Sequence, residues 1–392
     1  MTAYKIEDII KAVLVKEAYI LVKTGLMSQE DWEKLKTTHT TFQQNSKWFI
    51  RILFFLLGVL LLDLIIGFLA LFIFLNNSSS NDGLYLCILG LMASVAGAEI
   101  IARAKYYAHG LSDAFIIGIQ VMTFITIFTI LIDLENPPIW VACLGLSISS
   151  LYCYKRFVHS MSLLISVVAF IATIIALFIQ LGTITTLLLP FVLMLISIGI
   201  FYTSKTWGQK TKDLLLCKDL YVLYYLSFVL FYLASNYFII REASNELLYK
   251  ADEVATDIQF SYFFQACSYL LPIGYIALGL WWRDRMILWI GIVVGIIGVF
   301  TFRYYHHILP TEIVLTLSGS ILLAASLYLI KKLKHATEGF TFQKDPTQDS
   351  FTAMDLEILQ SALKNINSSI DIKPKTDFNG GSSSGGGASG SY

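Results

Sequence analysis

Apolar runs of about twenty residues recur through most of this chain and limit its possible folds more than any other feature. As a helix, a run of about twenty residues crosses the ~30 Å hydrocarbon core of a bilayer. Only 14% of the residues are charged and 56% are hydrophobic, whereas soluble domains carry roughly 25% charged residues. We therefore predict an all-α fold, a polytopic transmembrane helix bundle that has the lipid bilayer as its immediate partner.

The pattern predicts about ten spans within residues 48–331. Their expected limits are 49–75, 84–102, 114–134, 139–154, 161–180, 184–203, 220–240, 260–281, 286–302 and 311–330. The loops after the second, fourth, sixth and eighth spans hold ten Lys and Arg residues, whereas the alternate loops hold three. Because Lys and Arg are enriched in cytoplasmic loops, we expect both termini to be cytoplasmic.

Polar segments flank or interrupt these spans. Residues 1–47 predict a cytoplasmic helical pair, with Ser28 capping the second helix. Residues 241–259 predict an amphipathic helix in an outer loop, either a solvated connector or a lid over a binding site. Residues 332–378 predict a cytoplasmic segment with one amphipathic helix, and residues 379–392 a flexible Gly/Ser-rich tail. The N-terminal pair and the C-terminal tail are the expected contact sites for protein partners.

The segment "KTGLMSQEDWEKL", residues 23–35, carries a family resemblance. It resembles uncharacterised bacterial membrane proteins known only by a domain of unknown function, in which a glycine-leucine-serine-x-glutamate pattern precedes a similar hydrophobic array. Met27 interrupts that order here. The resemblance implies a location in the bacterial inner (cytoplasmic) membrane, and it implies no activity.

A single acid lies inside the first expected span, in the segment "LLLDLIIG" at residues 60–67. An ionised carboxylate in mid-bilayer costs about 2.5–3.5 kcal/mol, and no Lys, Arg or His lies in the middle of any expected span. We therefore expect Asp63 to face the interior of the bundle. Two interpretations stay open: a proton or cation site on a transport path, or a neutral acid that ties helices together through Gln120 or a hydroxyl.

Glu99 and Arg103 lie toward the cytoplasmic end of the second expected span. Their i, i+4 spacing, with the acid first, favours an ion pair along one helix. We expect this pair to anchor the helix at the membrane interface. The alternative is that the two residues close the inner end of a path that starts at Asp63.

The seventh expected span is dense in aromatic side chains, which recur at helical spacing. With two polar residues near the outer ends of the seventh and eighth spans, they could line a cavity for a lipid tail or a sugar ring. Packing and interfacial aromatic belts explain most such clusters without a ligand. The residues of this candidate aromatic cavity are Tyr221, Tyr225, Phe228, Tyr232, Asn236 and Gln265.

Two pairs of residues predict details of helix shape and packing. Pro190 and Pro272 interrupt apolar runs, which favours kinked helices over the broken helices of some transporters. Gly291 and Gly295 form a G-x-x-x-G pattern, which predicts a face where two helices approach closely.

The sequence has no P-loop, no dinucleotide fingerprint and no H-E-x-x-H motif, so we expect no cofactor. Its net charge of +0 indicates no bias toward nucleic acid. His306 and His307 are adjacent in an outer loop, and adjacent histidines seldom point at one metal ion, so no metal site is expected. An enzyme ranks third among the function classes, because no nucleophile–base pair stands out.

Two classes of function remain. One is a proton- or ion-linked transporter of a small solute or lipid, which should lose proton-linked flux in Asp63→Asn. The other is a non-catalytic membrane scaffold or sensor, which should lose function when residues 1–46 or 351–392 are deleted. The sequence favours transport narrowly and does not indicate the substrate or the oligomeric state.

Overall fold

The computed structural model describes a chain that divides into two compact units. One unit comprises Met1–Ala234 with Ala243–Gln259, and the other comprises Ser235–Glu242 with Phe260–Tyr392. The described residues are 2–23, 27–39, 42, 48–76, 82–134, 136–210, 214–248, 260–305 and scattered positions between 316 and 331. Most of the tenth expected span, His306 and His307, and residues 332–392 lie outside them.

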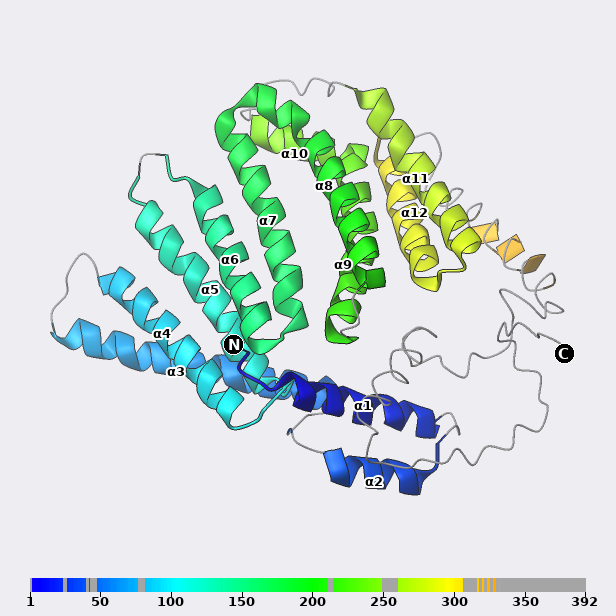
Figure 1. Ribbon diagram of the computed structural model, residues 1–392. Coiled ribbons are helices and arrows are strands. Elements are labelled where there is room, and N and C mark those ends of the chain that lie inside the picture. Colours follow the sequence, from blue (N-terminus) through cyan, green and yellow to red (C-terminus); the bar gives the residue numbers. More distant parts are fainter. Residues whose placement is uncertain are drawn as a thin grey trace. The chain divides into compact units, whose positions relative to one another are not determined.

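Over these residues the structure has twelve helices and no strand (Figure 1). They are α1 (Ile6–Lys23), α2 (Gln29–His39), α3 (Trp48–Asn76), α4 (Asp82–Arg103), α5 (Leu111–Leu131), α6 (Ile139–Phe157), α7 (Ser160–Leu181), α8 (Thr183–Lys210), α9 (Leu214–Ser235), α10 (Tyr237–Leu248), α11 (Ser261–Trp282) and α12 (Arg285–Tyr305).

Seven of the described helices are long and apolar enough to cross a membrane, namely α3, α4, α5, α7, α8, α9 and α11. The chain is therefore a multi-pass membrane protein, and it is all-helical over the residues that the structure describes. The seventh expected span ends earlier than its pattern predicts, because Asn236 separates α9 from α10. Pro190 lies inside the continuous helix α8 and Pro272 inside the continuous helix α11. Neither helix is broken at its proline, which agrees with the expectation of kinked rather than broken helices.

In the first unit, each helix from α4 to α7 packs against the one that follows it, and α3 packs on both α4 and α5 (Figure 1). Small residues allow the close approaches. A Cβ added to Gly58 of α3 would lie 2.6 Å from the Cβ of Ala114 on α5. Ser147 of α6 and Ser166 of α7 each donate a hydrogen bond to the other's backbone carbonyl, at 3.0 and 2.9 Å. These contacts hold α3 against α5 and α6 against α7.

The N-terminal helices belong to the same unit. Ser28 caps α2 as predicted, since its Oγ accepts the backbone N–H of Asp31 at 3.1 Å. Tyr4 and Ile9 are buried in one core cluster with Ile101 of α4 and Phe157 of α6. The segment that begins α1 is therefore docked on the spanning helices.

In the second unit, α11 and α12 form a hairpin. A Cβ on Gly291 would lie 2.9 Å from the backbone nitrogen of Ile276, and one on Gly279 would lie 2.8 Å from that of Leu288. The close approach predicted for Gly291 and Gly295 is confirmed at Gly291, whereas a Cβ on Gly295 would lie at an ordinary 3.7 Å from the Cβ of Pro272. At the start of this unit, Asn236 is buried and its Oδ1 accepts the N–H of Ile239 at 3.2 Å, which caps α10.

Candidate functional site

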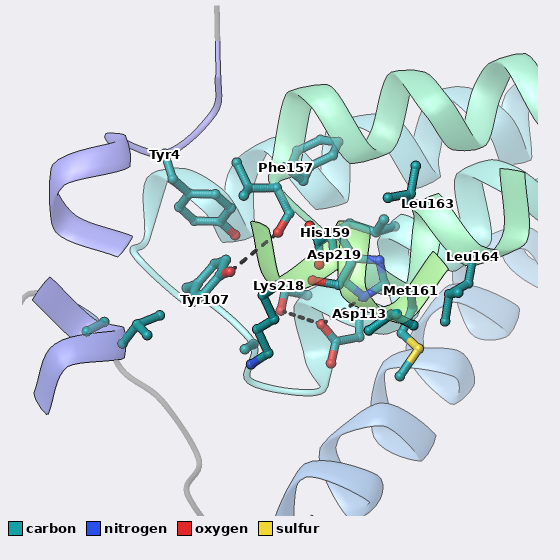
Figure 2. A pocket seen from close by; sticks show the side chains of 18 of the residues that line it. Tyr4, Tyr107, Asp113, Phe157, His159, Met161, Leu163, Leu164, Lys218 and Asp219 are labelled. Atoms are coloured by element: carbon teal, nitrogen blue, oxygen red, sulfur yellow. Dashed lines mark hydrogen bonds and ion pairs between the residues drawn. The ribbon is translucent and has the colours of Figure 1, made fainter. Parts of the chain in front are cut away.

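A cavity of about 340 Å³ lies at one end of the first unit (Figure 2). Five parts of the chain line it: α1, the α4–α5 loop with the first turn of α5, the start of α3, the α6–α7 junction, and the start of α9. Ionisable side chains gather among otherwise apolar walls. The lining residues on which the rest of the site depends are Tyr4, Arg51, Tyr107, Asp113, His159, Lys218 and Asp219.

Two unusual backbone positions bring these side chains together. Gly110, with φ of 95°, directly precedes α5 and lies against the backbone carbonyl of Arg51, where a Cβ would clash. This contact holds the start of α3 against the start of α5. Val158 ends α6 with a left-handed φ of 52°, so that α7 begins two residues later and His159 lies at a sharp corner.

Asp113 is the centre of the charge arrangement. Its carboxylate is buried and accepts hydrogen bonds from the guanidinium of Arg51, with Nη2 at 2.6 Å and Nε at 2.7 Å from Oδ2. The Nε2 of His159 lies 3.5 Å from the other oxygen, Oδ1. The Arg51 side chain is 41% exposed whereas that of Asp113 is 9% exposed. The cation therefore meets the cavity and the acid lies behind it.

A chain of polar contacts leads from Asp113 into the interior of the bundle. His159 Nδ1 lies 2.8 Å from Ser162 Oγ on α7, and the amide Nε2 of Gln120 on α5 donates to the same Oγ at 2.6 Å. A carboxylate can only accept, so Nε2 of His159 carries hydrogen toward Asp113 and Nδ1 of the neutral ring accepts from Ser162. The Oε1 of Gln120 is buried without a partner among the described residues.

A second acid, Asp219 of α9, is buried on the same cavity wall. Its carboxylate is hydrogen-bonded to the side chains of Tyr154 and Ser160. The neighbouring Lys218 is exposed. Both lysine and arginine thus present positive charge to the open part of the cavity, whereas both acids are satisfied inside its wall.

The N-terminal segment closes one side of the cavity. The Tyr4 hydroxyl donates to the carbonyl of Tyr106 at 2.8 Å, and the Tyr4 and Tyr107 rings meet edge to face with centroids 5.3 Å apart. The hydroxyl of Tyr107 reaches the carbonyl of Val158 at 3.4 Å. Burial raises the pKa of Tyr107 to about 12 and also raises the pKa of Tyr4, so both phenols stay neutral donors.

The structure corrects the ion pair expected within the second span. Glu99 pairs with Arg156 of α6, whose Nε and Nη2 lie 2.8 and 3.1 Å from its two oxygens. Arg103 is exposed, and its side chain makes no hydrogen bond or ion pair within the described part of the chain. A bidentate contact between helices is stronger than the i, i+4 contact along one helix, because both N–H groups of the guanidinium are used.

Asp63 also lies elsewhere than expected. It is on an exposed side of α3, among leucines and isoleucines, rather than facing the bundle interior. Its carboxylate makes no contact with Gln120, whose amide is used by Ser162. The expectation that Asp63 faces inward therefore fails.

The aromatic residues of α9 pack against α8. The ring of Phe201 stacks on that of Tyr224 and meets Phe228 edge to face, with centroids 5.2 and 5.5 Å apart. The cavity described above contains none of the residues proposed for an aromatic cavity. Of those, Phe228 and Tyr232 are buried, Tyr221, Tyr225 and Gln265 are half-buried, and Asn236 caps α10.

Sequence reasoning missed the central residues of the site, because Asp113, His159 and Asp219 each lie one or two positions before an expected span. One signal could have found them. In the expected order of ten spans, spans three, five and seven would all start on the same side of the membrane, as would span one, which begins beside Arg51. Ionisable residues at the starts of alternate spans are thus brought to one end of the bundle.

Comparisons with protein-family models, with curated proteins and with solved structures each find no match for this chain. The comparisons therefore lend no support to a bacterial inner-membrane origin, and the site must be interpreted from its own geometry. Across the residues that the structure describes, no group of three His, Cys, Asp or Glu side chains is placed to hold a metal ion.

Proposed function

We propose that this multi-pass membrane protein is a proton-linked transporter of a small organic anion, and that the cavity beside Asp113 is its binding site. The observation that carries the proposal is the position of His159. Its imidazole contacts an acid at the cavity wall on one side and the Ser162–Gln120 contact inside the bundle on the other. Histidine gains or loses a proton near neutral pH more readily than any other unperturbed side chain.

The charge distribution supports an anion as the solute. Lys218 is exposed and Arg51 is half-buried, and both line the cavity. The carboxylates of Asp113 and Asp219 are buried and already hydrogen-bonded. An incoming carboxylate would therefore meet cationic donors first, while Tyr4 and the apolar wall would accommodate its carbon skeleton.

Coupling follows from electrostatics. With neutral His159, the two cations and two acids of the wall balance, so a bound dicarboxylate leaves the cavity two charges negative. Proton uptake by His159 lowers this excess to one, because a nearby negative charge favours the charged imidazolium. The anion and the proton would thus bind together, which is the requirement for symport. The loop charges favour a cytoplasmic opening of the cavity and cytoplasmic termini.

The test is proton movement in proteoliposomes that contain a pH-sensitive dye. Succinate and glutarate, which cross a protein-free bilayer slowly, would be applied as an inward gradient, with choline as a cationic comparison. Wild type should acidify the lumen with at least one dicarboxylate and not with choline. His159→Gln should abolish the proton signal. His109→Gln is the matched control, because His109 is also buried but does not line the cavity.

Three outcomes are informative. Acidification that is lost in His159→Gln and kept in His109→Gln supports the proposal. Acidification that is equal in both variants removes His159 from the proton path. Wild-type vesicles that respond to neither dicarboxylate nor to sulfonates of similar size overturn the assignment of an anion.

A further inference from the structure

The exposed Asp63 points to a surface that the proposed transport site does not use. It lies midway along α3, on a helix whose most apolar window is only 11% buried. The neighbouring Leu60 and Leu64 are 58% and 63% exposed. A carboxyl group in this position would face hydrocarbon, which cannot hydrogen-bond to it, so a polar partner should cover it.

Neither the described helices of the second unit nor the sequence of the tenth expected span offers a charged partner in mid-helix. The described helices α11 and α12 of the second unit have no Asp, Glu, His, Lys or Arg between Ser261 and Trp282 or between Met286 and Phe302. The sequence of the tenth expected span carries only Glu312, close to its start. A second copy of the chain, however, would supply an acid at the same depth, because a two-fold axis along the membrane normal places each residue opposite its own equivalent.

The surface around Asp63 suits such a pairing. Leu56, Leu60, Asp63 and Gly67 follow one another at intervals of four, three and four residues, the spacing of a seam between two parallel helices. All four of these residues are exposed. A Cβ added to Gly67 would have no atom within 4 Å, so the surface is open one turn beyond the acid. Small residues at such positions let two spanning helices approach closely.

We propose that this seam, Leu56, Leu60, Asp63 and Gly67 of α3, is the interface of a parallel homodimer in which the two Asp63 carboxyl groups hydrogen-bond to each other. When one carboxyl is protonated, its O–H donates to an oxygen of the other. The polar contact then lies between two helices and is shielded from lipid.

Cysteine cross-linking in native membranes tests the interface. Leu60→Cys lies on the seam, and Leu61→Cys is its matched control, because it is at the same depth, is 40% exposed and lies about 100° around the helix. Under mild oxidation the Leu60→Cys dimer should form at least five times faster than the Leu61→Cys dimer. Unmodified protein, which has five cysteines of its own, gives the background.

The role of the acid is tested by the mass of the purified protein in lipid nanodiscs. Wild type and Asp63→Asn should be dimers, because an amide can still hydrogen-bond across the axis, and Asp63→Leu should be a monomer. Thermal melting of Asp63→Leu shows whether it is folded. Equal cross-linking at both positions, or a monomeric wild type, overturns the dimer. A folded Asp63→Leu dimer overturns the part played by Asp63.

Discussion

Arg51 and Asp113 join the first and third spanning helices through a hydrogen bond from Nε and an ion-pair contact from Nη2 to one carboxylate oxygen. The contact depends on a glycine at position 110, which lets the two helices meet at the level of the guanidinium. The most polar part of the bundle is therefore also the place where its long helices are held in register. This gives mutations at the site a stability readout that is independent of transport.

A double-mutant cycle measures this contact. Arg51→Met leaves the buried Asp113 carboxylate with only His159 and a 3.5 Å hydrogen bond from Ser112 Oγ, so the single variant should lose stability. In Arg51→Met/Asp113→Asn the unpaired charge is gone, and part of the loss should be recovered. We expect a coupling free energy of about 1–3 kcal/mol, reduced by the exposure of Arg51. Unfolding in mixed detergent micelles gives the four stabilities, and additive single effects would contradict the pair.

Substituting Gly110 should be more damaging than substituting a glycine in open space. Gly110→Ala places a side chain in a positive-φ position and against the Arg51 carbonyl. We expect a loss of about 1–3 kcal/mol, seen as a lower melting temperature. Gly199→Ala is the control, since a Cβ there meets nothing within 4 Å and alanine favours a helix. A similar melting temperature for both variants would show that the contact is dispensable.

The stability of the fold should fall at mildly acidic pH because of His109. Burial lowers the pKa of this imidazole below its ordinary value of 6.5, against an opposing effect of the Asp113 carboxylate. Because the unfolded chain binds the proton more readily, the contribution of His109 is complete above about pH 6.5 and is lost as the pH falls. Between pH 7.5 and 5, wild type should lose more stability than His109→Gln. Parallel pH curves would exclude His109 as the cause.

Removing the Tyr4 hydroxyl should loosen α1. Tyr4→Phe keeps the ring contact with Tyr107 but loses the hydrogen bond to Tyr106, about 1 kcal/mol. If α1 exchanges its amide hydrogens by undocking, their exchange rate should rise roughly fivefold. Hydrogen-exchange mass spectrometry of α1 measures this. Tyr202→Phe, at an exposed position of α8, should leave the rate unchanged.

Exchanging the charges of Glu99 and Arg156 tests the other ion pair of this region. Each single reversal places two like charges within reach, so Glu99→Arg and Arg156→Glu should both melt earlier. The double variant should recover most of the loss, because the bidentate geometry links α4 to α6 in either sense. Arg103→Glu should have little effect, since this exposed side chain makes no pair in the described part of the chain. A double variant as unstable as the singles would argue against the pair.

The sequence predicts the membrane class and most helix positions because the length and polarity of apolar runs follow directly from bilayer thickness. The close approach at Gly291 is also predictable, since G-x-x-x-G is a local pattern. Contacts between helices are not local. Glu99 pairs with Arg156 rather than with Arg103, and Asp63 lies on the exposed side of α3. Both depend on the rotation of a helix about its axis, which is set by the neighbouring helices. The charged cluster depends on the positive φ values of Gly110 and Val158. A pattern of apolar residues does not predict such backbone conformations.

The docking of the N-terminal segment has a consequence for biosynthesis. The amide of Ala3 donates to the carbonyl of Arg156 at 2.7 Å. This hydrogen bond cannot form until the ribosome has made about 150 further residues. At about 5–20 residues per second, translation takes roughly 10–30 s to reach that point. During this interval α1 can contact α2 and then Ile101 of α4, but its contact with the end of α6 cannot yet form. The N-terminal contact can therefore be completed only after α6 has been made, when α7 to α12 are still to be synthesised.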